Sequence, residues 1–120
     1  MRAIAVLGLF LLLAPAAAGA GTEVVVVDVD TDINPVTAEF LKRVVEEAAE
    51  DGAPAVVLRI NTPGGRLDST REITKTILAS EIPVLGFVHP PGSQAASAGF
   101  IVLMACDVAA MAPGRTPGPP

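Results

Sequence analysis

A hydroxyl surrounded by very small side chains is the first feature of this sequence that could do chemistry. Ser97 lies within the run Ala95–Gly99, directly after a stretch rich in proline and glycine at 90–92. Small neighbours let a substrate come within contact distance of a side-chain oxygen. If a helix begins at the first residues of this run, Ser97 lies in its first turn, where unpaired N–H groups favour negative charge. That setting suits a nucleophile, although the same small residues would also suit close helix packing.

A pair of glycines forms the second feature. The stretch Asn61-Thr-Pro-Gly-Gly65 follows an apolar run at 55–60. Pro63 followed by Gly64 predicts a type II turn in which Gly64 has a positive φ. Gly65 is more than the turn needs, and it lets the backbone approach another group closely or direct an N–H outward. Such N–H groups can hold the oxyanion that forms when a hydroxyl attacks a carbonyl, so the two features together predict an acyl-transfer site.

The elements that position these features alternate between strand and helix. We predict four strands, and the first is so continuously apolar that it suits a strand covered on both faces. The strands are predicted at 23–30, 55–60, 83–88 and 108–111, and the helices at 35–51, 67–79 and from the small-residue run to about 104. This order predicts an α/β fold with a parallel sheet and right-handed crossovers. The carboxyl ends of the second and third strands then bring Gly64, Gly65 and Ser97 to one edge of the sheet.

The predicted faces of the first two helices follow from apolar residues at helical spacing. Asn34 is expected to cap the first helix, with Pro35 at its first position and Gly52 at its end. Its predicted inward residues are Val36, Phe40, Leu41, Val44, Val45 and Ala48, and those of the second helix are Leu67, Thr70, Ile73, Thr74 and Ile77.

Composition argues against several other functions. The acids outnumber Lys and Arg by 13 to 8, so a nucleic-acid surface is not expected. Asp30, Asp32 and Asn34 alternate as in a calcium loop, but the required glycine and closing glutamate are missing. His89 and Cys106 have no metal-ligand spacing around them, so no metal is expected.

The first twenty residues have the pattern of a targeting segment. Arg2 precedes an apolar stretch at 4–13, and small residues follow at 16–20. Cleavage after Ala18 or Ala20 is the preferred interpretation, with an uncleaved membrane anchor as the alternative. The predicted organisation is a signal peptide or anchor, a single domain and a tail rich in proline and glycine, at 1–20, 21–114 and 115–120.

Three segments carry a resemblance to a known family: Leu58–Gly65, Ala95–Gly99 and Asp107–Gly114. With them, the chain resembles the Clp-protease/crotonase superfamily and, within it, NfeD-type membrane-bound serine proteases related to signal peptide peptidase A. The resemblance implies ClpP/crotonase-like βα units. It also implies a secreted or periplasmic location, or the extracytoplasmic face of a membrane.

The resemblance further implies a role for each residue of the site. Ser97 would be the nucleophile, and Gly65, with Gly64, and the Ala98 amide would form the oxyanion hole. Family members cut peptide bonds with a serine-lysine dyad and need no metal or organic cofactor. They prefer apolar stretches of membrane-associated proteins, stomatin-type proteins among them, and assemble as homo-oligomers, either dimers or larger rings.

The family's lysine has no evident counterpart in this sequence. It comes from a segment well beyond the turn that ends at Gly114, and only six residues follow Gly114 here. Lys42 and Lys75 each lie about 10 Å from the start of a predicted helix by helical rise, which places neither at the loop edge. His89 could approach Ser97, but no third group is evident to orient it. We therefore expect a protease domain that is incomplete at its C-terminus and inactive by itself.

Two alternatives from other classes stay open. One is a catalytically inactive module that keeps the peptide groove for binding or assembly. The other is a relative of the crotonases that binds acyl-CoA in the same oxyanion geometry. The secretory start disfavours the second alternative, because such thioesters are cytoplasmic.

Overall fold

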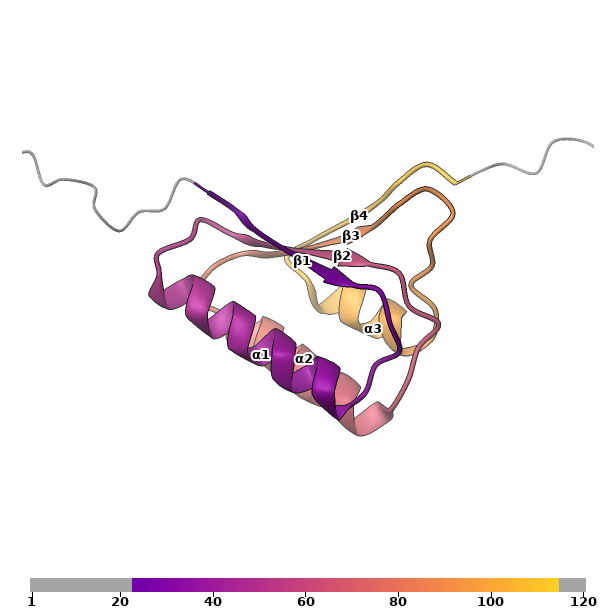
Figure 1. Cartoon of the computed structure of the whole chain (residues 1–120), viewed down its shortest axis with the longest axis horizontal. Coiled ribbons are helices and arrows are strands. Elements are labelled where there is room, and N and C mark those ends of the chain that lie inside the picture. The colour runs from indigo at the N-terminus through magenta and orange to yellow at the C-terminus, as the bar shows by residue number, and fades with distance from the viewer. Residues whose placement is uncertain (1–22, 115–120) are drawn as a thin grey trace, which may run out of the picture.

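The computed structural model describes residues 23–114 as one parallel sheet with helices between its strands (Figure 1). The elements are β1 (Val25–Val29), α1 (Pro35–Glu50), β2 (Val56–Ile60), α2 (Leu67–Ala79), β3 (Val84–Val88), α3 (Ala98–Ala105) and β4 (Val108–Met111). The strands lie in the order β1-β2-β3-β4 and every pair is parallel, so the predicted α/β fold is confirmed. The predicted leader at 1–20 and tail at 115–120 lie outside the described residues.

The strand order explains why the sheet is covered on one side. Each crossover moves one strand further in the same direction, and a uniform hand of crossover then puts every helix on the same face. Figure 1 shows all three helices below the sheet. The prediction that the first strand is covered on both faces is therefore wrong for the described residues: Val27 is buried towards the helices, whereas Val26 is 52% exposed.

The core lies between the sheet and the three helices. Alternate residues of β2 and β3 point into it, with Leu58, Ile60 and Val84 almost completely buried. Gly86 lets α3 lie against β3, because a Cβ at this position would come within 2.7 Å of Leu103. No helix within residues 23–114 is long and apolar enough to cross a bilayer.

Helix α1 begins and ends where the sequence predicts. The Asn34 side chain accepts hydrogen bonds from the N–H groups of Val36 (2.9 Å) and Thr37 (3.0 Å), and Pro35 occupies the first helical position. At the other end Gly52 has a φ of 72°, which favours glycine. The caps thus fix the length of the helix.

The buried face of α1 is rotated from the predicted one. Leu41, Val45 and Ala48 are buried as predicted, but Val36 is 77% and Phe40 46% exposed. Residues four apart are separated by about 400° of helix, so a row at every fourth position drifts by about 40° per step and leaves the core. In α2, Thr70, Ile73 and Ile77 are buried as predicted and Thr74 is half-buried, but Leu67 at the start of the helix is exposed.

Arg59 and Asp28 form an ion pair on the open face of the sheet. Arg59 donates from Nε to Asp28 Oδ1 (2.7 Å) and from Nη2 to Asp28 Oδ2 (2.8 Å), which supplies the carboxylate that a charged residue in an apolar strand needs. The hydrogen bond from Arg59 lowers the pKa of Asp28.

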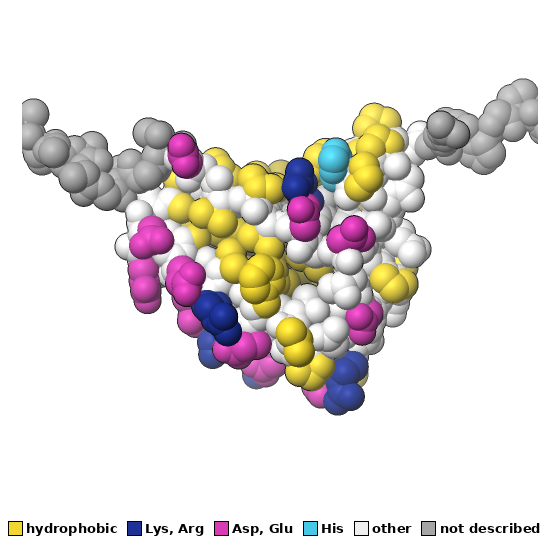
Figure 2. All heavy atoms as spheres, in the orientation of Figure 1, with side chains coloured by type: hydrophobic (Ala, Val, Ile, Leu, Met, Phe, Trp, Pro, Cys, Tyr) yellow, Lys and Arg dark blue, Asp and Glu magenta, His cyan; other side chains and the backbone are white. Residues whose placement is uncertain are grey.

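An apolar row runs across the same face. The paired positions Val26, Val57, Leu85 and Val108 align across the four strands. Figure 2 shows acidic side chains spread over α1 and hydrophobic side chains at the surface between that helix and the sheet. Among residues 23–114, no strand pairs with the outer side of β4, and apolar surface beside such an edge strand favours self-association.

The rotated face of α1 gives the first testable prediction. We expect Leu41→Ala to lower the free energy of unfolding by about 2–5 kcal/mol, because it opens a cavity in the core. Phe40→Ala should cost about 1 kcal/mol or less, because much of its ring is already in water. Urea unfolding followed by circular dichroism measures both values, and an equal cost for the two variants would contradict the observed burial.

The second testable prediction concerns the edge strand β4, whose residues are all exposed. Val108→Lys should reduce concentration-dependent self-association in light scattering, because a charge on an edge strand opposes pairing with another copy. Val36→Lys, which makes the same change on the exposed side of α1, is the matched control. Equal effects of the two substitutions would contradict association through the outer side of β4.

Candidate active site

The turn after β2 is anchored against the loop between β1 and α1. Gly64 has the predicted positive φ, at 120°. Its carbonyl accepts a hydrogen bond from Ile33 N–H (2.8 Å), and the Ile33 carbonyl accepts one from Arg66 N–H (2.8 Å). A Cβ on Gly65 would overlap the Ile33 backbone, with 2.6 Å to its carbonyl carbon. The close approach that the second glycine predicts is therefore an approach to Ile33.

Ser97 lies one position before α3. The helix begins at Ala98, so the expectation that it begins at Ala95 or Ala96 is wrong and Ser97 is the N-cap residue. Its φ of 51° and ψ of −114° lie in a region that costs a non-glycine residue about 1–3 kcal/mol, which the surrounding structure must offset. Ser97 is exposed, and within residues 23–114 its hydroxyl makes no hydrogen bond. The sharp turn thus presents a free hydroxyl at the surface.

The structure brings the glycine turn and the serine together, as predicted. A Cβ on Gly64 would lie 3.0 Å from Ser97 Cβ, 3.3 Å from the Ala96 oxygen and 3.5 Å from the Ala98 nitrogen. Parallel bridges join Ile33 to Gly65 and Thr62 to Ala95 along the same edge. Gly64 can lie against Ser97 only because it has no side chain.

Several backbone N–H groups around Ser97, its own among them, have no acceptor among the described residues, and two of them belong to the glycine turn and to the start of the helix. These are the N–H groups of Gly65 and of Ala98, the first residue of α3. The Gly64 N–H, by contrast, donates to Thr62 Oγ1 (3.2 Å). Free N–H groups at a helix start carry partial positive charge, so the surface around Ser97 favours a developing anion. An exposed hydroxyl beside such donors has the composition of an acyl-transfer site.

Asp68, after the glycine turn, and Cys106, after α3, are poorly suited to act as a base or a nucleophile at neutral pH. Arg66 Nη2 lies 2.8 Å from Asp68 Oδ2, and hydrogen bonds from Arg66 and from the Ser69 N–H lower the pKa of Asp68 to about 2. Asp68 is thus a weak base. Burial, with a smaller effect of Asp107, raises the pKa of Cys106 to about 11, so its thiol stays protonated at neutral pH.

The two lysines and the histidine make contacts elsewhere. Lys75 Nζ lies 3.4 Å from Glu72 Oε1 on α2, and Lys42 lines a hollow between α1 and α2. The His89 ring lies against Phe87, with 5.1 Å between the ring centroids. None of these contacts reaches Ser97, so the described residues show no base beside the hydroxyl.

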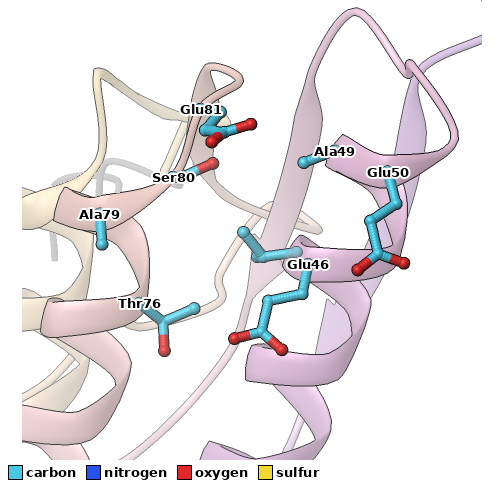
Figure 3. Close-up of a pocket in the computed structure, with 8 residues that line it drawn as sticks. Glu46, Ala49, Glu50, Thr76, Ala79, Ser80 and Glu81 are labelled. Carbon is cyan, nitrogen blue, oxygen red and sulfur yellow. The ribbon is translucent and has the colours of Figure 1, made fainter.

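A groove of about 320 Å³ lies elsewhere, between α1 and α2 (Figure 3). Glu46, Ala49 and Glu50 line it from α1, and Thr76 and Ala79 line it from α2. These residues belong to the last turns of both helices, which lead into β2 and β3 at the sheet edge opposite Ser97. The groove therefore belongs to a different surface from the candidate site.

Two residues of the site region have contacts that the sequence does not reveal. Ile33 supplies the backbone against which Gly65 lies, and Thr62, with no exposed surface, bonds to the Gly64 turn. The available signals were an apolar residue inside the polar stretch 30–34 and a hydroxyl directly before Pro63-Gly64. Neither signal identifies a partner, because both partners come from segments distant in the sequence or from backbone atoms.

Comparison with known proteins gives a consistent result. The family model described as "NfeD1b, N-terminal domain" matches residues 23–119. The membrane-bound protease PH1510 of Pyrococcus horikoshii is 40% identical over 86 residues, which cover 72% of this chain and 20% of that protein. The chain thus spans about a fifth of the length of this relative.

Solved structures agree with the sequence match. The membrane-bound stomatin-specific protease 1510-N, solved as a lysine-to-alanine variant with a substrate peptide, superposes with a TM-score of 0.75 at 38% identity. The alignment covers 78% of this chain and 42% of that one. ClpP1 from Listeria monocytogenes shares the fold, with a TM-score of 0.59 at 20% identity over 69% of this chain and 46% of that one.

The family match extends over the whole described sheet and includes the Gly64–Gly65 turn and the Ser97 loop. The chain therefore belongs to the family of NfeD1b N-terminal domains, whose relatives include membrane-bound proteases.

Proposed function

We propose that this chain carries the nucleophile and oxyanion hole of a serine endopeptidase. The observation that carries this proposal is the position of Ser97: an exposed, unbonded hydroxyl at a strained N-cap, packed directly against Gly64. The free N–H groups of Gly65 and Ala98 support it, because they supply the charge stabilisation that attack on a carbonyl requires.

In the proposed reaction, Ser97 Oγ attacks the carbonyl carbon of a peptide bond while a base takes its proton. The carbonyl oxygen becomes negative, and the N–H groups of Gly65 and Ala98 donate to it. One donor of this kind is worth about 3 kcal/mol of barrier. The amine leaves with a proton, and water then hydrolyses the acyl ester.

Gly64 has a different part in this proposal. Its N–H already donates to Thr62 Oγ1, so it is not available for the oxyanion. Position 64 requires a glycine, because a Cβ at Gly64 would lie 3.0 Å from Ser97 Cβ. We therefore assign the two oxyanion donors to Gly65 and Ala98, and assign to Gly64 the clearance beside the serine.

We assign the general base to a lysine contributed from outside these 120 residues. Lys75 lies beside Glu72 on the exposed side of α2, and Lys42 lies on the hollow between α1 and α2, so neither is positioned to take the Ser97 proton. The solved relative that binds a substrate peptide is a lysine-to-alanine variant, which supports a serine-lysine dyad. Burial of such a lysine would lower its pKa towards neutrality and make it a base.

The proposed substrates are apolar segments of membrane-associated polypeptides, stomatin-type proteins among them. The solved relative is named as stomatin-specific. In this chain, exposed apolar side chains flank both halves of the site: Leu67 follows the Gly65 turn and Phe100 follows Ser97. We further propose an extracytoplasmic location, based on the targeting pattern at the N-terminus, and a homo-oligomer.

A non-catalytic peptide-binding module is the second candidate. The contacts of Lys42 and Lys75 favour it, because they leave Ser97 without a base among the described residues. In that case the free N–H groups would hold a carbonyl of a bound peptide without any reaction. Chemical reactivity of Ser97 distinguishes the two candidates.

The test supplies the missing base from solution. A fluorophosphonate probe should modify Ser97 slowly in the purified chain, and an added alkylamine should accelerate the reaction about tenfold or more, since a general base contributes about 10²–10⁴-fold. Peptide mapping by mass spectrometry locates the adduct. Ser93, in the loop before Ser97, is an internal control, and Ser97→Ala should abolish labelling. A folded chain in which Ser97 stays unmodified with amine present would favour the binding module.

A further inference from the structure

Thr62 makes contacts with both halves of the proposed site. It has no exposed surface, and it lies between the end of β2 and the Gly64 turn. Its hydroxyl, its backbone and its methyl group each contact a different structure. No part of Thr62 is free to touch a substrate, so any role in the reaction must act through its neighbours.

The hydroxyl bonds to the glycine turn. Thr62 Oγ1 accepts a hydrogen bond from Gly64 N–H (3.2 Å) and donates to the Gly64 carbonyl (3.3 Å). The Gly64 carbonyl also accepts the Ile33 N–H, whereas the described residues offer the Gly64 N–H no acceptor besides this hydroxyl. Through the N–H, the hydroxyl holds the Pro63–Gly64 peptide. Through the carbonyl it contacts, together with Ile33, the Gly64–Gly65 peptide that carries the Gly65 N–H.

The backbone of Thr62 bonds to the serine loop. Thr62 N–H donates to the Gln94 carbonyl (2.7 Å), and the Thr62 carbonyl accepts from Ala96 N–H (3.1 Å). These two bonds form the parallel bridge between Thr62 and Ala95. They set the register of the loop that ends at Ser97.

The methyl group contacts helix α3. A Cβ on Gly99 would overlap Thr62 Cγ2, whereas the next nearest atoms, Ala95 Cβ and the Thr62 oxygen, lie 3.7 Å away. Gly99 is buried in the first turn of α3, one residue after Ala98. The methyl group thus determines how closely the start of the helix approaches β2.

We propose that Thr62 is a positioning residue that aligns the two oxyanion donors with Ser97: its hydroxyl orients the Gly65 N–H, and its methyl group sets the position of the Ala98 N–H. This inference rests on the proposed function of Ser97. It extends that function by assigning the alignment of both donors to one buried side chain.

The hydroxyl is tested with Thr62→Val, which keeps the branched shape, and Thr62→Ser, which keeps the hydroxyl. Thr62→Val should accelerate amide exchange of Gly64 about tenfold or more, because a lost hydrogen bond to a buried group costs about 1–3 kcal/mol and each 1.4 kcal/mol is tenfold. Thr62→Ser should leave this exchange within about threefold of the wild type. Exchange is measured by NMR on folded samples.

The same variants are tested in the amine-assisted labelling of Ser97. Thr62→Val should lower the maximal labelling rate about tenfold, since small misplacements of catalytic groups cost up to about 10²-fold, and should leave the concentration for half-maximal rate nearly unchanged. Thr70→Val is the matched control, because Thr70 is also a buried threonine whose hydroxyl donates to a backbone carbonyl, that of Arg66 (2.7 Å). Thr70→Val should leave the maximal labelling rate and the concentration for half-maximal rate nearly unchanged.

The methyl group is tested by a double-mutant cycle with Gly99→Ala. Alone, Gly99→Ala should lower the melting temperature by about 5 °C or more, as expected for about 1 kcal/mol in a domain of this size. With Thr62→Ser the overlapping methyl group is gone, and Gly99→Ala should then cost less than about 2 °C. The cycle needs only Thr62→Ser, Gly99→Ala and the double variant to fold. It therefore tests the contact between the Thr62 methyl group and Gly99 even if Thr62→Val fails to fold.

Three results would overturn the role of Thr62: unchanged Gly64 exchange in Thr62→Val, an unchanged labelling rate in Thr62→Val, or an additive cycle with Gly99→Ala. Failure of the proposed function has a different signature. In that case Ser97 of the wild type is not labelled at all. Amide exchange of Gly64 and the double-mutant cycle with Gly99→Ala still report whether Thr62 aligns the two loops.

Discussion

The site depends on close contacts that are possible only because one partner in each is a glycine. Gly65 lies on the backbone of Ile33, Gly64 lies on Ser97, and Gly99 lies on the methyl group of Thr62. Glycine at each of these contacts lets three loops share one edge of a parallel sheet at van der Waals distance. The order of the strands brings the loops to the same edge, and the glycines let them touch.

The strained conformation of Ser97 follows from the same contacts. The Thr62–Ala95 bridge fixes where the loop arrives, and burial of Ala98 and Gly99 fixes where the helix departs. The residue between these two constraints must turn sharply, and at Ser97 it does so with a positive φ. Strain of this kind persists only where the surroundings over-determine the backbone.

Much of the fold could be predicted from the sequence, because apolar runs, helix-capping residues and the glycines that end helices or form turns are local signals. The Asn34 cap, the positive φ of Gly64 and the meeting of Gly64 with Ser97 are examples. What could not be predicted depends on distant partners. The exposed side of α1 is set by the angle at which the helix packs, so Phe40 was placed wrongly. The start of α3 depends on how Thr62 holds the preceding loop, and no local signal encodes that.

The contact between Gly65 and Ile33 has a mechanical consequence. Ile33 directly precedes Asn34, the residue that caps α1. It is hydrogen-bonded to the residues before and after Gly65, namely Gly64 and Arg66. The two backbones lie in contact at Gly65, so the position of the glycine turn and that of the first turn of the helix depend on one another. In the proposed function, the turn that supplies the Gly65 N–H is therefore built directly onto the start of α1, the longest helix among the described residues.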